Sequence, residues 1–451
     1  MRIHFIAIGG AAMHNLALAL HDAGHHVTGS DDDIKDPSRS RLEEAGLLPP
    51  AMGWHPERIQ PECDVVVLGM HAREDNPELL RALDLNLTVQ SYPEFLFEAT
   101  KRKHRVVIGG SHGKTTITSM VLHVLHQLER PTDFMVGAQL HGFDRMVQLE
   151  PDHDMVVLEG DEYLSSPMDR RSKFHWYAPQ TTLLTGIAWD HINVFPTEAD
   201  YVETFRTYLQ TLPENATVIH CLEDKLLNQT LSECHRTDLL MKGYVTPEHM
   251  ASGDNLSKIV WPDGGQTFTP LRGTHNMQNL SGARTLCQAL GVLTNDFDQV
   301  IQSFRGAARR LEMVADDPSR NWTVFRDFAH APSKLNATTE GIRSAYPDRK
   351  LVAVFELHTF SSLNPDFLPT YAGSLATADE ALVFYDPAVV RAKHLPDLAP
   401  EQVKTAFDQM DLQVFTSVQE LEFHLFNLEK NNAVVLLMSS GYFSGLQWPQ
   451  D

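Results

Sequence analysis

The amino-acid sequence predicts an α/β protein of three domains, from its length and from the alternation of strands and helices. The chain has 451 residues, and domains of roughly 150 residues would divide it into three. Short runs of β-branched residues alternate with helical stretches throughout, as in parallel sheets covered by helices. A composition with 42% hydrophobic and 21% charged residues is that of a globular protein and excludes a collagen-like or mostly disordered chain.

Residues 1–103 are predicted to form a Rossmann-like domain. A strand at residues 3–8 leads through Gly9 and Gly10 into a helix. A dinucleotide-binding GxGxxG fingerprint would need glycine at positions 7, 9 and 12, but the chain has alanine at the first and last of these. This departure favours a site adapted to UDP over one for NAD. An NAD-dependent dehydrogenase would account for this domain alone.

A phosphate-binding loop is predicted at the start of the second domain, residues 104–306, between an apolar strand and a helix that begins at the lysine. Backbone N–H groups of such a turn converge on phosphate oxygens, the lysine reaches the β- and γ-phosphates, and the first threonine offers its hydroxyl to Mg²⁺. The chain departs from the GxxxxGK[ST] pattern at Ile108. The loop comprises Gly110, Ser111, His112, Gly113, Lys114, Thr115 and Thr116.

Candidate metal ligands follow two further strands of this domain. An apolar run at residues 155–158 ends at Glu159, where phosphate-loop proteins place a metal-binding acid. The alternative is that Glu159 belongs to a solvated acidic loop. The next strand leads to Asp190 and His191, and a histidine there can ligate a second divalent ion. Taken alone, His191 also has a structural interpretation.

The third domain, residues 307–451, is predicted to be a small doubly wound α/β domain. Four apolar runs, at residues 322–325, 351–355, 381–385 and 434–438, have the composition of buried parallel strands. The boundary near Gly306 precedes the first of them. Basic residues at 101–104 mark the earlier boundary, because a new strand begins directly after them.

Charge and cysteine content restrict the partners and the compartment. The formal charge of −22 opposes binding to nucleic acid or to anionic membranes. Four scattered cysteines show no zinc-binding spacing and favour a reducing compartment, so we expect a cytoplasmic protein. No apolar run approaches the roughly 18 residues that span a bilayer. We expect a monomer or a weak homo-oligomer.

A series of motifs in one order resembles the Mur ligase superfamily, the ATP-dependent amide-bond-forming enzymes of peptidoglycan precursor synthesis. The series runs through all three predicted domains. It consists of Gly110 to Thr116, Glu159, Asp190-His191, Gly273-Thr274-His275-Asn276-Met277-Gln278-Asn279, Arg309-Arg310-Leu311-Glu312 and Asp327-Phe328-Ala329-His330-Ala331-Pro332.

The resemblance implies that the protein uses ATP and two Mg²⁺ ions. It also assigns roles to particular residues. Lys114, His191 and Arg310 would be catalytic. Glu159 and Thr115 would bind the first ion and His191 the second. The resemblance places Asn276 and Asn279 beside the adenine, Arg310 at the γ-phosphate, Asp327 at the ribose and His330 between the nucleotide and the incoming substrate. The C-terminal domain would close on ATP and bind the incoming peptide.

The N-terminal domain resembles the branch of that superfamily that takes UDP-N-acetylmuramate itself. Two amine substrates are then open: L-alanine, or the recycled tripeptide L-alanyl-γ-D-glutamyl-meso-diaminopimelate. Three stretches resemble those of the enzyme that takes the tripeptide and therefore favour it: Glu162-Tyr163 with residues 169–174, residues 438–443, and residues 69–72. A non-catalytic protein that binds UDP-muramyl peptides is a third possibility. The residues expected to bind the UDP-sugar are Gly9, Gly10, Ala11, Met13, Ser30, Asp31 and His71.

Two departures from the family pattern concern the second ion. Gly186 replaces an asparagine four residues before the Asp-His pair, and residues 191–215 contain no lysine that could be carbamylated. A second Mg²⁺ would therefore depend on His191, substrate oxygens and water.

The residues expected near the incoming amine are Glu356, His358, Ser361 and Ser362.

Overall fold

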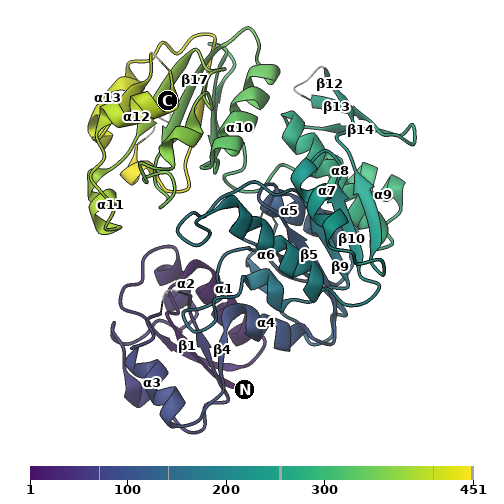
Figure 1. Ribbon diagram of the computed structural model, residues 1–451, viewed down its shortest axis with the longest axis vertical. Coiled ribbons are helices and arrows are strands. Elements are labelled where there is room, and N and C mark those ends of the chain that lie inside the picture. Colours follow the sequence, from purple (N-terminus) through teal and green to yellow (C-terminus); the bar gives the residue numbers. More distant parts are fainter. Residues whose placement is uncertain (71, 141, 253–255, 410, 448–451) are drawn as a thin grey trace. The chain divides into compact units, whose positions relative to one another are not determined.

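The computed structural model describes residues 1–451 except 71, 141, 253–255, 410 and 448–451. The described chain divides into two compact units, whose helices and strands are labelled in Figure 1. The first unit contains Met1–Ile187, Val202–Tyr244 and Gly282–Phe297. The second unit contains Ala188–Tyr201, Val245–Ser281 and Asp298–Asp451. No helix among the described residues is long and apolar enough to cross a membrane.

The N-terminal sheet of the first unit has four parallel strands in the order β2-β1-β3-β4. All four residues of β3 are buried, as expected for a strand of a parallel sheet. Asn76 caps α3, since its side chain accepts from the N–H groups of Glu78 and Leu79, and Ser91 forms a capping box with Glu94 at α4. The elements are β1 (Arg2–Ile6), α1 (Ala11–Asp22), β2 (His26–Ser30), α2 (Ser38–Glu44), η1 (Pro56–Arg58), β3 (Val65–Leu68), α3 (Pro77–Asp84), β4 (Val89–Ser91) and α4 (Tyr92–Thr100).

The central sheet of the first unit has the order β11-β10-β9-β5-β8-β6-β7 and is parallel except for β7. β5 is its middle strand, so the loop that follows β5 lies at the centre of the sheet's carboxyl edge. The elements are β5 (His104–Gly109), α5 (Lys114–Gln127), β6 (Asp133–Met135), β7 (Val147–Gln148), β8 (Met155–Glu159), η2 (Lys173–Trp176), β9 (Thr181–Leu184), α6 (Glu198–Thr211), β10 (Thr217–Cys221), α7 (Lys225–Glu233) and β11 (Leu240–Tyr244).

The turn-rich stretch that the sequence shows before residue 273 contains a small antiparallel sheet in the second unit. Its order is β12-β13-β14, which the sequence did not predict because its strands are short and separated by turn residues. The elements of this part of the chain are β12 (Glu248–Ser252), β13 (Leu256–Val260), β14 (Gln266–Thr269), α8 (Thr274–Ala289), α9 (Thr294–Val300) and η3 (Ile301–Ser303).

The C-terminal sheet has the order β15-β16-β20-β17-β18-β19, with β15 antiparallel to its neighbour and the other pairs parallel. Alternate residues of β17 enter two hydrophobic cores, one on each face: Phe355 packs with Leu335 of α10, and Val354 with Leu421 of α13. The elements are β15 (Glu312–Asp317), β16 (Trp322–Asp327), α10 (Pro332–Ala345), β17 (Lys350–Glu356), η4 (Leu368–Tyr371), β18 (Glu380–Phe384), α11 (Pro387–Ala392), α12 (Pro400–Phe407), β19 (Gln413–Phe415), α13 (Val418–Phe426), β20 (Ala433–Met438) and η5 (Phe443–Gly445).

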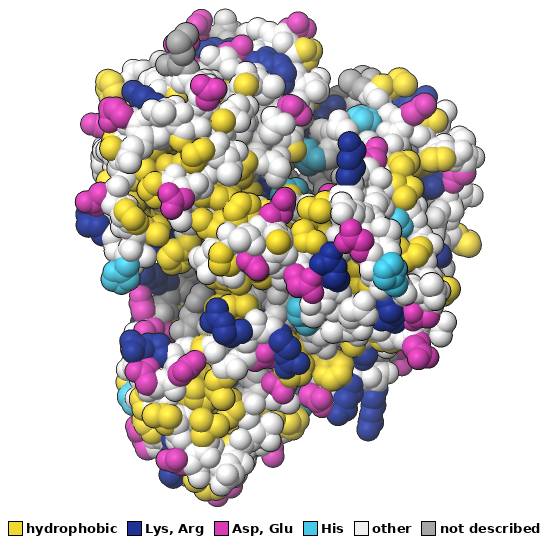
Figure 2. All heavy atoms as spheres, viewed as in Figure 1, with side chains coloured by type: hydrophobic (Ala, Val, Ile, Leu, Met, Phe, Trp, Pro, Cys, Tyr) yellow, Lys and Arg dark blue, Asp and Glu magenta, His cyan; other side chains and the backbone are white. Residues whose placement is uncertain are grey.

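The predicted α/β class with parallel sheets in the N-terminal, middle and C-terminal parts is confirmed. The strand predicted at residues 3–8 is too long, because β1 ends at Ile6 and Ala7 turns the chain with a positive φ of 69°. Acidic and basic side chains are interspersed over the face that Figure 2 shows.

Candidate functional site

The phosphate loop lies between β5 and α5, and its shape depends on glycine. Gly110 and Gly113 have φ values of 116° and 74°, in the region that only glycine enters easily. A Cβ atom on Gly110 would collide with the Thr185 side chain. The Ser111 N–H donates to the Gly186 carbonyl at 3.0 Å. Helix α5 begins at Lys114, as predicted, so its N-terminal N–H groups belong to the loop.

Ile108 lies inside β5, which explains its departure from the loop pattern. It is fully buried and pairs in register with Glu159 of β8. The loop of this chain therefore begins at Gly110. The parallel register brings the end of β8, with its carboxylate, beside the loop.

Lys114 is held in the loop by a carboxylate to which the sequence analysis assigned no role. Its Nζ donates to the Gly110 carbonyl at 2.6 Å and to Glu162 Oε2 at 2.7 Å. The Glu162 side chain is only 2% exposed. Burial alone would lower the pKa of Lys114, but Glu162, Asp161 and Glu159 together raise it above its ordinary value. Lys114 is therefore a fixed ammonium group. The signal for Glu162 was its place in the acidic stretch after β8.

Thr115 and Glu159, the candidate ligands of the first Mg²⁺, are in direct contact. Thr115 Oγ1 donates to Glu159 Oε1 at 2.8 Å, and Glu159 Oε2 accepts from the Gly137 N–H at 2.7 Å. No group of three or more histidine, cysteine, aspartate or glutamate side chains arranged for a metal occurs among the described residues. Mg²⁺ commonly uses one or two protein oxygens, with water and phosphate as its other ligands. The two residues fit such an ion.

The residues expected at the UDP-sugar meet at the carboxyl ends of β1 and β2. Gly9, Gly10, Ala11 and Met13 form the β1–α1 turn and the start of α1. The Gly9 N–H donates to Asp31 Oδ2 at 2.7 Å. A side chain at Gly9 would press on that carboxylate and on Ile34. Asp31 is 7% exposed. Burial, assisted by the charge of Asp32, raises the pKa of Asp31 to about 6.

A buried network that the sequence analysis missed lies beside Ser30. Glu78 accepts from the His55 N–H at 2.7 Å and contacts His4 Nε2 at 3.3 Å. Burial alone would raise the pKa of Glu78, but hydrogen bonds from His4, Ser30 and His55 lower it below its ordinary value. Ser30 also accepts from Arg58 at 3.2 Å. Glu78 thus fixes Ser30 at the end of β2.

The second unit holds Asp190, His191 and His330 together, with Lys334 as an unpredicted neighbour. Asp190 Oδ2 lies 3.4 Å from Lys334 Nζ and 3.7 Å from His330 Nε2. Burial alone would raise the pKa of Asp190, but Lys334, His330 and His191 hold it well below its ordinary range. Burial, followed by Lys334, lowers the pKa of His330. His330 Nδ1 lies 2.8 Å from the Phe328 carbonyl, which accepts a hydrogen bond from the ring.

Asp327 and the two arginines lie where β16 ends. The Asp327 oxygens accept from the N–H groups of Leu311 and Ala329, each at 2.7 Å. Arg310 stacks on Phe328, with its Cζ 4.3 Å from the ring centroid. The Arg309 Cζ lies 5.1 Å from the ring centroid of Phe328 and 4.6 Å from that of Tyr442. Asp327 therefore holds the backbone of the segment that carries both arginines.

The remaining predicted residues have simpler surroundings. Asn276 is buried and donates to the Arg272 carbonyl at 2.8 Å, and Asn279 follows it in α8. Gly186 has a φ of 151°, and a side chain there would collide with the Asp224 carboxylate, so the asparagine of the family pattern does not fit this loop. His71 lies outside the described residues.

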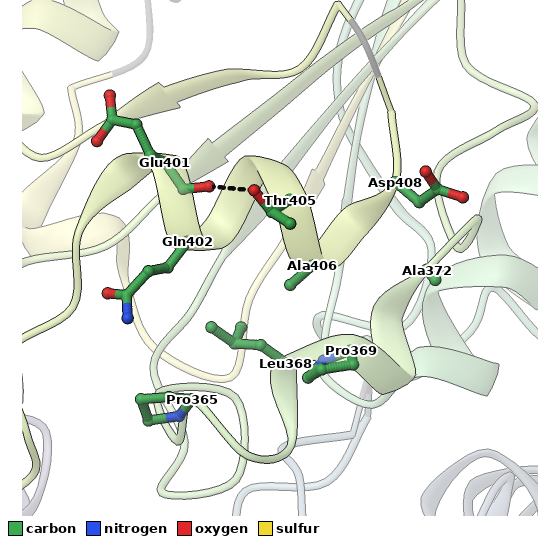
Figure 3. Close-up of a pocket in the computed structure, with 9 residues that line it drawn as sticks. All are labelled: Pro365, Leu368, Pro369, Ala372, Glu401, Gln402, Thr405, Ala406 and Asp408. Carbon is green, nitrogen blue, oxygen red and sulfur yellow. Dashed lines mark hydrogen bonds between the residues drawn. The ribbon is translucent and has the colours of Figure 1, made fainter.

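A hollow of about 600 Å³ lies in the second unit, between η4 and α12 (Figure 3). Leu368 and Pro369 face Ala406 across it, and Glu401 and Asp408 stand at its rim (Figure 3). None of the residues predicted for the site lines it. The hollow therefore does not contribute to the candidate site.

A glycine turn, a fixed lysine and a threonine–carboxylate pair at the edge of a parallel sheet define a nucleotide-binding enzyme of the phosphate-loop class. Three family models cover most of the chain: "Mur ligase family, catalytic domain" matches residues 2–104, "Mur ligase middle domain" residues 108–287, and "Mur ligase, glutamate ligase domain" residues 309–441. The chain belongs to the Mur ligase family. It is an ATP-dependent amide ligase of peptidoglycan synthesis that acts on UDP-muramyl compounds.

Two relatives with different names are similar to the whole chain. A UDP-N-acetylmuramate–L-alanine ligase from Desulfitobacterium hafniense (strain Y51) is 27% identical over 450 residues, which cover 98% of this chain and 97% of that protein. A UDP-N-acetylmuramate–L-alanyl-γ-D-glutamyl-meso-2,6-diaminoheptandioate ligase from Escherichia coli (strain K12) is 28% identical over 458 residues, covering 99% and 96%. These identities are too alike to select one amine substrate.

A solved structure is similar over the same length. It is a murein peptide ligase from Psychrobacter arcticus 273-4, with a TM-score of 0.69, 25% sequence identity and coverage of 99% of this chain and 97% of that one.

Replacing Lys114 by alanine should abolish ATP-dependent turnover and leave UDP-sugar affinity within about twofold. The reason is that the phosphate loop and the residues expected at the UDP-sugar lie at the strand ends of two different sheets. The loss in rate should be at least about 100-fold. Because Glu162 would remain buried without its cation, at a cost of roughly 3–5 kcal/mol, the double variant Lys114→Ala/Glu162→Gln should recover stability and stay inactive. Ligation rates and calorimetric binding measure the two effects. Loss of both functions in a folded variant would contradict this division.

Replacing Glu159 by alanine should shift the Mg²⁺ dependence of ligation to higher concentration by at least about tenfold, because one of the two protein ligands is lost. UDP-sugar affinity should change little. The exposed Asp152, replaced by alanine, is the matched control. A Mg²⁺ titration that superimposes on that of the parent would exclude Glu159 as a ligand.

Replacing Asp31 by asparagine should change the stability of the N-terminal sheet more favourably at pH 7.5 than near pH 4. The amide carries no charge, and at either pH it keeps only one of the two oxygens that accept the Gly9 and Asp32 N–H groups. A folded-state pKa of about 6, above the unfolded value of about 3.9, means that ionised Asp31 opposes folding above pH 6 by about 2–3 kcal/mol. That penalty disappears as the pH falls through 6 toward 4. Hydrogen exchange of β1 and β2 amides, compared with the parent at each pH, should show the variant relatively more protected at pH 7.5 than near pH 4. An equal effect at both pH values would contradict the assignment, and the exposed Asp33, replaced by asparagine, is the control.

Proposed function

We propose that this enzyme joins UDP-N-acetylmuramate to the tripeptide L-alanyl-γ-D-glutamyl-meso-diaminopimelate, with ATP and Mg²⁺. The proposal narrows the family's activity to one amine substrate. The similarity to the Escherichia coli tripeptide ligase and to the murein peptide ligase structure supports it.

The observation that carries the proposal is the segment after β20, which resembles the corresponding segment of tripeptide ligases. It lies at the carboxyl edge of the C-terminal sheet, where Glu356 accepts from Ser439 Oγ and from the Phe443 N–H. Among the described residues, His358 Nδ1 and Ser440 Oγ are buried there without a hydrogen-bond partner. Buried polar groups in native proteins are normally paired, so these two are suited to a polar ligand such as a peptide.

L-Alanine is the second candidate for the amine substrate. The observation in its favour is that the Desulfitobacterium hafniense relative and several others are L-alanine ligases by name. A protein that only binds UDP-muramyl peptides is disfavoured, because simple binding requires neither the fixed ammonium of Lys114 nor the Thr115–Glu159 pair.

In the proposed reaction, a muramoyl carboxylate oxygen attacks the γ-phosphorus of ATP, ADP leaves, and an acyl phosphate forms. The tripeptide amine attacks the carbonyl carbon of this acyl phosphate, inorganic phosphate leaves, the nitrogen loses a proton to solvent, and an amide bond remains. Lys114, fixed by Glu162, offsets the repulsion between the two anions, and Arg310 adds a second positive charge. Mg²⁺, when bound, screens the same charges. Thr115 and Glu159 would hold the first ion and His191 a second.

The other site residues keep their proposed roles. Gly9, Gly10, Ser30 and Asp31 would bind the UDP-sugar, and His330 would border the peptide. The proposed domain limits are residues 1–103, 104–306 and 307–451. The residues proposed to contact the nucleotide beyond the phosphate loop are Asn276, Asn279, Arg310 and Asp327.

Ligation with UDP-N-acetylmuramate, ATP and Mg²⁺ should give a product with the tripeptide and not with free L-alanine. Product masses distinguish the two, and omission of ATP or use of the Lys114→Ala variant controls for background. Alanine product alone would assign the biosynthetic reaction. Absence of both products, with tight binding of UDP-N-acetylmuramate retained, would refute the ligase and favour the binding protein.

A further inference from the structure

Residues 188–201 are attached to the core of the C-terminal part of the chain. They belong to the second unit, although in the sequence they fall within the middle-domain match at residues 108–287. The Trp189 ring meets Phe367 edge-on at 6.0 Å, and Ile192 packs against the hydrophobic core beneath α10. Two apolar anchors thus flank Asp190 and His191.

The Asp190 carboxylate is the polar anchor between them. It is 4% exposed, and such a buried carboxylate is strongly unfavourable unless cations or donors surround it. Its Oδ1 accepts from the His191 N–H at 2.7 Å. Its Oδ2 faces Lys334 Nζ at 3.4 Å. The two oxygens therefore join the His191 turn to α10.

Lys334 supplies a full positive charge to this cluster, 3.4 Å from Asp190 Oδ2. Burial, and after it the charge of Lys334, lowers the pKa of the neighbouring His330. Lys334 lies in the first turn of α10, which begins at Pro332, and a cation there is disfavoured by the helix dipole. Attraction to the Asp190 carboxylate offsets this unfavourable interaction between Lys334 and the helix dipole.

His191 depends on this anchor because its backbone is in a left-handed conformation. Its φ is 57°, a value that a residue other than glycine adopts only when the surroundings enforce it. The hydrogen bond from its N–H to Asp190 is one such restraint, and Lys334 restrains Asp190 in turn.

We propose that Lys334 is a positioning residue that holds the Asp190 carboxylate and thereby fixes the turn that presents His191. The consequence for the second ion rests on the proposed role of His191 as its ligand. The positioning itself is independent of that role.

Hydrogen exchange of residues 188–197, in the full-length protein without nucleotide or metal, tests the positioning directly. Lys334→Met keeps the aliphatic stem and removes the charge, and it should speed exchange of this segment at least tenfold. Lys334→Arg should stay within about twofold of the parent. The exposed Lys404 on α12, replaced by methionine, is the matched control. Unchanged exchange in Lys334→Met would overturn the proposal.

A double variant separates this contact from general destabilisation of the domain. Asp190→Asn should loosen the same segment, and adding Lys334→Met should have no further effect, because the two side chains act as one unit. Additive effects would overturn the proposal. Faster exchange spread equally over β16, β17 and β20 in both single variants would likewise overturn it.

The Mg²⁺ dependence of ligation then tests the consequence. Lys334→Met should raise the Mg²⁺ concentration for half-maximal rate several-fold and leave KM for UDP-N-acetylmuramate unchanged, with recovery in Lys334→Arg. If His191→Ala does not alter the Mg²⁺ dependence while Lys334→Met still loosens residues 188–197, the second-ion role of His191 fails and the positioning role of Lys334 stands.

Discussion

The buried ion pair between Lys114 and Glu162 is the interaction on which the candidate nucleotide site depends. A glycine turn gives the phosphate loop its shape, but it does not determine where a long lysine side chain lies. Glu162 does so, at 2.7 Å, and the neighbouring acids keep the lysine charged. Because breaking a buried pair leaves an uncompensated charge, the lysine and the loop after β8 are stabilised together.

The same acidic stretch therefore has two functions in the fold. Glu159 ends β8 and pairs with Thr115, while Glu162, three residues later, pairs with Lys114. One loop thus fixes both a candidate metal ligand and Lys114, the cation proposed to bind phosphate. The parallel register of β5 and β8 makes this possible, since it brings Ile108 and Glu159 level with each other.

Buried carboxylates with specific partners recur at the other candidate sites. Glu78 is paired with His4 and fixes the end of β2, and Asp190 is paired with Lys334 and fixes the His191 turn. Asp31 differs from Glu78 and Asp190 in its pKa, which burial raises to about 6. A carboxylate kept at such a cost is typical of a functional position, in agreement with its proposed place at the UDP-sugar.

The sequence by itself determined the α/β class, the phosphate loop and the family. Each of these is encoded locally: strand and helix patterns show in short windows, and the motif from Gly110 to Thr116 specifies its own turn. The roles of Glu162 and Lys334 were decided only by tertiary structure, because their partners are 48 and 144 positions away in the chain. Gly186 is similar, since only the approach of Asp224 shows why a side chain does not fit there. Ion pairing and close packing act through space, and a sequence pattern records only what is near along the chain.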